Sequence, residues 1–185
     1  MTTQEKNGIT EGVIWKQLLI FFFPILVGSF FQQLYNTVDS VIVGQFVGKE
    51  ALSSVGGSAG QIISLVVGFF TGVSTGATVI ISQYFGAGKK EEIEESLHTA
   101  YAFALVGGLV LGIAGIVFAP QMLLWMNTPE ELIAESVLYV RVYFSGLIFI
   151  FIYNMGAAIL RAVGDSKRPL YYLIVCSVVN IILDL

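Results

Sequence analysis

Two carboxylates occur in stretches of sequence that are otherwise uncharged and mostly apolar. Asp39 is the one charged residue between Gln17 and Gly48, and no charged residue separates Pro169 from Asp184. A charged side chain at membrane depth costs several kcal/mol, so such residues usually face a cavity and serve an ion or proton pathway. The two acids therefore predict a site that handles a cation.

Polar side chains accompany Asp39 at helical spacing. Gln32, Tyr35, Asn36 and Asp39 occupy positions i, i+3, i+4 and i+7. This spacing places all four on one face of a helix. We expect Gln32, Tyr35 and Asn36 to line a cavity together with the carboxylate.

The second acid has an amide on the same helix face, because Asn180 and Asp184 are four residues apart. Asn154 adds an amide from a different apolar stretch. Hydrogen bonds that only hold a helix bundle together, worth about 0.6 kcal/mol each, explain the amides equally well. They explain the acids poorly, because neutral amides would pack at a lower desolvation cost.

The chemistry of these groups favours exchange of one cation for another. Carboxylate and amide oxygens suit a hard cation such as Na⁺, and a buried carboxyl group can also take up and release H⁺. Aromatic walls from Phe30, Phe31 and Tyr35 could hold a lipophilic organic cation. Competition of both cations for the same carboxylates would give antiport, and the residues do not choose between Na⁺ and H⁺.

The composition places these residues in a membrane protein. The chain has 185 residues, of which 56% are hydrophobic and 12% charged, with a mean hydropathy of +0.82. A soluble domain carries about 25% charged residues. The net charge of −4 owes much to the acids at positions 91, 92, 94 and 95, and this local cluster indicates no nucleic-acid partner.

Five apolar segments predict an all-α integral membrane protein. About 20 apolar residues are needed to cross the ~30 Å hydrocarbon layer as a helix. The last segment is the shortest, and no polar stop signal follows it, so we expect a truncated piece of a longer protein. The segments cover residues 14–43, 52–84, 99–124, 137–160 and 170–185.

Basic residues predict the orientation of these spans. Seven are assigned to the side that holds the N-terminus and two to the other side. This bias places the N-terminus in the cytoplasm of a multi-pass protein of the plasma or inner membrane. The first group is Lys6, Lys16, Lys89, Lys90, Arg161, Lys167 and Arg168, and the second is Lys49 and Arg141.

Pro24 falls inside the first predicted span. It removes one helical hydrogen bond and clashes with the carbonyl of Ile20, so a kink is expected there. A static bend and a moving hinge explain this proline equally well.

Small residues recur at every fourth position from Gly56 to Gly76 in the second span. Such a ridge lets a second helix backbone approach closely. Gly108 and Gly112 repeat the pattern in the third span.

The residues do not indicate an enzyme or a bound cofactor. His98 and Cys176 are single and far apart, so they offer neither a nucleophile–base pair nor a metal set. A phosphate-binding loop ending at Lys89 is rejected, because Gln83 and Lys90 stand where the pattern needs glycine and serine or threonine. The absence of an ATP motif favours a carrier driven by an ion gradient.

Four motifs together resemble the multidrug and toxic compound extrusion (MATE) family. The first is Pro-Ile-Leu at 24–26 followed by Gln-Gln-Leu-Tyr-Asn-Thr-Val-Asp at 32–39. Ser-Gln-Tyr-Phe-Gly-Ala-Gly at 82–88 resembles the loop after that family's second helix. Residues 161–169 resemble its loop between helices four and five, and Asn-Ile-Ile-Leu-Asp at 180–184 resembles its fifth helix.

This resemblance implies twelve helices in two lobes and expulsion of lipophilic cations against Na⁺ or H⁺. The chain would supply helices one to four and most of five of the N-terminal lobe, and the rest of the polypeptide would complete the transporter. Pro24 would bend during the outward-to-inward change. The implied ion-coupling residues are Asp39, Asn154, Asn180 and Asp184, with Na⁺ held at Asp39, Asn180 and Asp184.

A related lipid-linked saccharide flippase is the alternative function. Its cavity should carry several basic residues to pair with pyrophosphate. The five spans offer only Arg141, which favours the antiporter.

Overall fold

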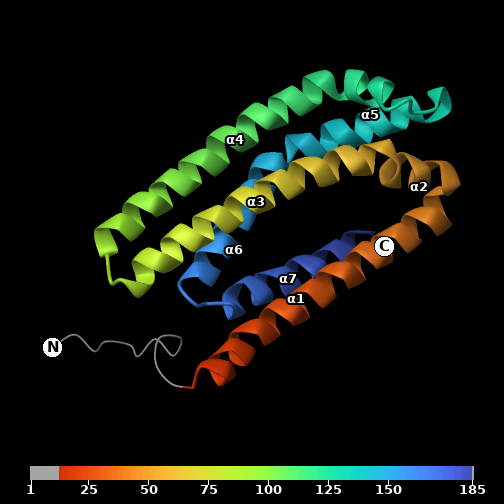
Figure 1. The fold of residues 1–185 in the computed structure, drawn as a ribbon. Helices are drawn as coiled ribbons and strands as arrows, with labels where there is room; N and C mark the ends of the chain where they lie inside the picture. The colour runs from red at the N-terminus through yellow and green to blue at the C-terminus, as the bar shows by residue number, and fades with distance from the viewer. Residues whose placement is uncertain (1–12, 185) are drawn as a thin grey trace.

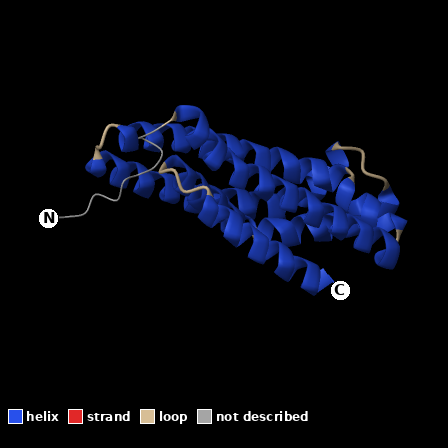
Figure 2. Cartoon of the chain, turned by 90° about the horizontal axis from the view of Figure 1, so that it is seen from below, coloured by secondary structure: helices blue, strands red, loops and turns tan. Residues whose placement is uncertain are grey.

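The described part of the chain, residues 13–184 of a computed structural model, is built from helices joined by short turns (Figures 1 and 2). The predicted all-α fold is confirmed. Lys6 and Leu185, which entered the predictions above, lie outside the described residues. The elements are α1 Ile14–Ile42, a π-helical segment Val43–Val47, α2 Lys49–Gly56, α3 Ser58–Gly86, α4 Lys90–Trp125, α5 Glu130–Ser145, α6 Leu147–Ala162 and α7 Lys167–Asp184.

Three of the described helical stretches are long and apolar enough to cross a membrane. They are Ile14–Phe46, Lys49–Gly86 and Lys90–Trp125. Helices α5 and α6 meet at a bend of 49° and together pass the same test as a fourth span. Helix α7 has 18 residues and is not among the stretches that pass.

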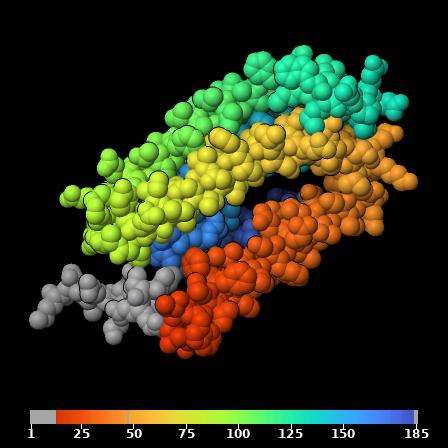
Figure 3. Space-filling model, in the orientation of Figure 1, coloured from red at the N-terminus to blue at the C-terminus, as the bar shows by residue number. Residues whose placement is uncertain are grey.

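The helices fall into two groups. Helices α3, α4, α5 and α6 pack against one another, whereas α1 packs mainly on α7 (Figure 1). The groups are joined by α2 at one end and by contacts between α6 and α7. In the space-filling view, the blue atoms of the last helices are visible between orange α1 and yellow α3 (Figure 3). The fold therefore leaves room between α1 and the larger group.

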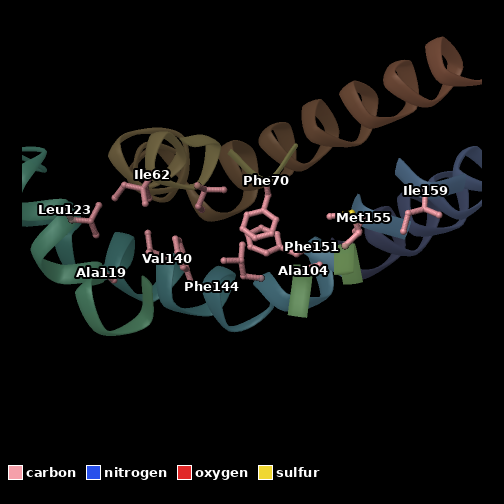
Figure 4. Close-up of a cluster of buried hydrophobic side chains, with 14 of the residues drawn as sticks. Ile62, Phe70, Ala104, Ala119, Leu123, Val140, Phe144, Phe151, Met155 and Ile159 are labelled. Carbon is pink, nitrogen blue, oxygen red and sulfur yellow. The ribbon is translucent and has the colours of Figure 1, made fainter. Parts of the chain in front are cut away.

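The larger group has a closely packed aromatic centre. The rings of Phe70 in α3 and Phe151 in α6 stack with their centroids 3.2 Å apart (Figure 4). Phe144, Met155 and Val140 are buried around them. Because lipid chains are as apolar as these side chains, close packing rather than removal from water stabilises this interior.

Glycines of α4 allow the close approach of α5 and α6. A Cβ at Gly108 would lie 2.9 Å from the Cα of Ile148, and one at Gly112 would lie 3.0 Å from the carbonyl oxygen of Phe144. A Cβ at Gly115 would overlap the Phe144 ring. The prediction of a small-residue contact in the third span is confirmed.

The longer ridge of the second span behaves differently. A Cβ at Gly68, Gly72 or Gly76 would meet nothing within 4 Å, whereas one at Gly60 would lie 2.8 Å from the carbonyl oxygen of Val55 in α2. Within residues 13–184, the predicted close backbone contact is therefore not formed at Gly68, Gly72 or Gly76. Helix α3 packs on α4 through Phe70 instead, and a Cβ at Gly107 of α4 would lie 2.6 Å from that ring.

Candidate functional site

The polar face predicted on the first span is present on α1. Tyr35 and Asp39 are half-buried, and Gln32 and Asn36 are exposed. The face ends just before the π-helical segment Val43–Val47, a distortion that is frequent at functional sites. The α1 part of the predicted site therefore consists of four polar side chains on one continuous helix.

Helix α7 runs beside α1 in the same direction (Figure 1). A Cβ at Gly28 would lie 3.5 Å from Leu173 and 3.6 Å from Leu170. Asp39 and Asp184 are each eleven residues beyond Gly28 and Leu173, or about 16 Å further along each helix at a 1.5 Å rise. The two acids thus have backbone positions at one level, although the Asp184 side chain lies outside the described residues.

Asn180 has a buried oxygen without a donor. Its side chain is half-buried, and its Oδ1 forms no hydrogen bond. Nearly all buried polar atoms have a partner, so an orphaned one calls for a ligand or a water. An amide oxygen beside carboxylates fits a hard cation. The part of the chain that the structure describes contains no group of three or more His, Cys, Asp or Glu residues that could hold a metal ion, so a cation here would need amide or backbone oxygens.

Asn154 lies in a different part of the interior. Its Nδ2 donates to the carbonyl of Ile150 at 2.8 Å, and it lines a cavity with Phe21 of α1. Phe21 is eighteen residues before Asp39, about 27 Å along α1. The assignment of Asn154 to the ion site stays a prediction.

Two tyrosines of α5, Tyr139 and Tyr143, were not singled out from the sequence. Both are half-buried, and burial is the main influence on their phenol groups, with smaller contributions from Asp39 at Tyr139 and from Tyr139 and Tyr35 at Tyr143. The rings of Tyr139 and Tyr143 lie 6.4 Å apart. Their spacing of four residues was the one available signal, and an aromatic wall here would suit an organic cation.

Arg161 directly follows the predicted span 137–160. It lies in the last turn of α6 and is half-buried. It lines the same cavity as Asn154. Arg141, by contrast, is exposed, and its Nε donates to the carbonyl of Ile116 at 3.2 Å.

Pro24 is buried inside α1, which continues as a helix on both sides of it. The proposed bend or hinge at this residue stays a prediction.

A further cavity lies away from Asp39. It has a volume of about 570 Å³ and lies between α3 and α4, with Tyr84, Glu92, Glu95 and Phe103 in its lining. Glu92 is paired with Lys89 at 3.1 Å. The two acids that line this cavity, Glu92 and Glu95, belong to the first turns of α4. They lie at the opposite end of the bundle from Asp39 of α1 and Asp184 of α7.

Comparison with known proteins places this arrangement in a family. The MatE family model matches residues 24–185. The chain is 32% identical over 183 residues to the probable multidrug resistance protein YoeA of Bacillus subtilis, covering 99% of this chain and 39% of that protein.

Solved structures of MATE transporters support the same family assignment. The chain matches an outward-facing multidrug resistance MATE family transporter of the MOP superfamily with a TM-score of 0.91 and 25% identity, covering 100% of this chain and 40% of that one. It matches a MATE in complex with MaD3S with a TM-score of 0.90 and 25% identity, covering 99% and 41%. The chain thus spans about two fifths of the length of these relatives.

Proposed function

Since the chain belongs to the MatE family, we propose that the full-length protein expels small lipophilic cations by antiport with Na⁺ or H⁺. Its apolar helices and its relatives make it a multi-pass membrane protein of a transporter family. Within that protein the chain would form the N-terminal lobe, with its N-terminus in the cytoplasm of the cell membrane. The rest of the same polypeptide would supply the other lobe.

The observation that supports ion coupling most is the orphaned Oδ1 of Asn180. It belongs to the helix that lies beside α1, four residues before the acid that shares the level of Asp39. The proposed coupling ion binds the carboxylates of Asp39 and Asp184 and this amide oxygen. Asn154 is the fourth proposed member, reached when the lobe rearranges.

The proposed exchange follows from competition for negative charge. An organic cation is held by the carboxylates and by aromatic faces, which attract cations through their quadrupole. Binding of Na⁺ or H⁺ neutralises the carboxylates, removes that attraction and releases the substrate. Tyr35, Tyr139 and Tyr143 would supply the aromatic faces, with Gln32 and Asn36 as polar contacts.

The flippase alternative is not favoured. The relative reported above is named a multidrug resistance protein, and the matched transporter is of the multidrug resistance type. Recognition of pyrophosphate favours several basic side chains in one cavity. Arg141 is exposed, so Arg161 is the one arginine that lines either of the cavities described here.

Uptake of ethidium into everted membrane vesicles, which corresponds to efflux from the cell, tests this proposal. Full-length native protein and the Asp39→Asn variant are compared under an imposed Na⁺ gradient and, separately, under an imposed H⁺ gradient. We expect one gradient to drive efflux by the native protein and the variant to lose at least about tenfold in initial rate, since a coupling charge is removed. Native protein that responds to neither gradient would overturn the antiport proposal.

Asp165→Asn is the matched control. This substitution also replaces a carboxylate with an amide. The Oδ1 of Asp165, however, accepts hydrogen bonds from the backbone N–H groups of Lys167 and Arg168 at the start of α7. Asparagine fills such a capping position about as well as aspartate. We expect its efflux rate to stay within about twofold of native, because the lost ion pair lies at the surface, with the Arg168 side chain 68% exposed.

A further inference from the structure

A polar cavity lies between α1, α3 and α6, and of the proposed ion-site residues only Asn154 is in its lining. Its volume is about 210 Å³. This is smaller than the 300–1,000 Å³ range typical of drug-sized sites, so it suits one functional group and its attached ring. Its lining consists of Phe21, Thr71, Ser74, Thr75, Thr78, Asn154, Ala158 and Arg161.

Arg161 brings a permanent positive charge to this cavity. The guanidinium is not deprotonated in proteins. Within the described chain, none of the ion pairs or hydrogen bonds involves its side chain, and the lining of the cavity includes no acidic residue. A half-buried cation in a membrane helix is costly unless it is paired. The charge therefore calls for an anion.

Ser74 adds a second unfulfilled group on the opposite wall. It is only 4% exposed, and its Oγ has no hydrogen-bond partner. The hydroxyl is therefore a free donor in the cavity wall. Buried hydroxyls without partners are rare and indicate a missing ligand or water.

Some of the remaining polar side chains already donate their hydrogen bonds to backbone carbonyls, and others have a donor without a partner. The hydroxyls of Thr71, Thr75 and Thr78 donate to carbonyls one turn earlier in α3 at 2.8 to 2.9 Å. Asn154 uses one amide hydrogen on Ile150 and keeps the other. The available donors are thus those of Arg161, Ser74 and Asn154, which is the donor set of an anion site.

We propose that this cavity binds the carboxylate of an organic solute. Arg161 would pair with it in the planar, two-bond geometry that guanidinium and carboxylate share, and Ser74 would donate a third hydrogen bond. Phe21 and Ala158 offer apolar surface to the attached group. As a substrate subsite this assignment rests on the proposed transport function.

Equilibrium dialysis of the purified full-length protein with radiolabelled benzoate tests the proposal. The protein is delipidated in a neutral detergent, and benzamide serves as the uncharged probe of the same shape. We expect saturable benzoate binding and at least about tenfold weaker benzamide binding, because the charge-assisted hydrogen bonds are lost. Arg161→Gln should lower benzoate affinity about tenfold or more.

Arg168→Gln is the matched control, because Arg168 is exposed at the same end of the bundle and pairs with Asp165 at 3.1 Å. It should bind benzoate as the native protein does. Ser74→Ala should lower benzoate affinity about three- to tenfold and should raise the unfolding temperature of the ligand-free protein, since an unpartnered buried hydroxyl is removed. A substitution that only destabilised the fold would lower both the benzoate affinity and the unfolding temperature.

Three results would overturn the assignment. One is equal benzoate affinity in native protein and Arg161→Gln, and another is no benzoate binding. The third is binding of dioleoyl phosphatidylglycerol that depends on Arg161 while benzoate binding does not, which would assign the cavity to a lipid headgroup. Dialysis needs no ion gradient, so failure of antiport in vesicles leaves these outcomes unchanged.

Discussion

Asn180 distinguishes a binding role from a packing role at the scale of single residues. Its buried Oδ1 has no donor, so the side chain adds little to the stability of the fold. We predict that Asn180→Leu, which keeps the volume, raises the ion concentration for half-maximal efflux at least about tenfold. The unfolding temperature of the full-length protein should not fall, and Asn180→Asp should restore part of the ion dependence.

A fall in the unfolding temperature with unchanged ion dependence would identify Asn180 as a packing residue instead. The ion dependence of efflux is measured in vesicles and the unfolding temperature in detergent, both on the same protein preparations.

Single residues were predictable where their type was out of place. Asp39 is conspicuous because no other charge is near it in the sequence. Tyr139 and Tyr143 were missed because aromatic residues are ordinary in an apolar span, and only the packed helices show which way they face. The position of Arg161 inside the last turn of α6 was not predicted, because helix ends cannot be located from sequence to better than a few residues.

Close packing of α4 explains its glycines at the scale of elements. We predict that Gly108→Ala lowers the stability of the full-length protein by about 1–3 kcal/mol, because its Cβ would lie 2.9 Å from the backbone of Ile148. Thermal unfolding in detergent measures the change. Gly86→Ala is the control, since a Cβ at Gly86 meets nothing within 4 Å. Equal unfolding temperatures for both variants would contradict the packing described here.

Two helices contain an interior proline, which allows the hinge at Pro24 to be tested against a neutral case. We predict that Pro24→Ala slows ethidium efflux at least about fivefold, because alanine restores the hydrogen bond to Ile20 and stiffens α1. Pro120→Ala in α4 should change the rate less than twofold, since α4 packs firmly on α5 and α6. Comparable rates for native protein and Pro24→Ala would leave a static bend as the explanation.

The existence of the helices followed from apolar runs, but their contacts did not. The small-residue ridge of α3 predicted a partner backbone, and the described chain places none at Gly68, Gly72 or Gly76. The bend of 49° between α5 and α6 was not expected either. Residue spacing shows which face of a helix can pack closely, while the position of the other helices decides whether it does.

At the scale of the whole molecule, the orientation of the chain decides which end of the bundle meets the cytoplasm. We predict that the turn after α3 is cytoplasmic and the turn before α5 is outside. In a full-length variant made free of cysteine by changes including Cys176→Ser, a membrane-impermeant maleimide should label Glu130→Cys but not Ala87→Cys in intact cells. Both should react after the membrane is permeabilised. The reverse pattern would contradict the proposed orientation.

The room between α1 and the group formed by α3, α4, α5 and α6 was not predictable from the sequence, because it depends on how α7 covers α1. It gives the molecule two separate polar regions, one at Asp39 and Asn180 and one at Arg161 and Ser74. Opposite charges at the two regions would let one lobe hold a cation and an acidic group together.

Transport by purified full-length protein in liposomes tests the central claim, that Asp39 couples the ion to the substrate, most directly. Two rates are measured, accumulation of ethidium driven by an ion gradient and exchange of labelled for unlabelled ethidium without a gradient. The account predicts that Asp39→Asn loses accumulation at least about tenfold while Asp165→Asn keeps both rates, since only Asp39 lies within a span. Accumulation by Asp39→Asn at the native rate would contradict it.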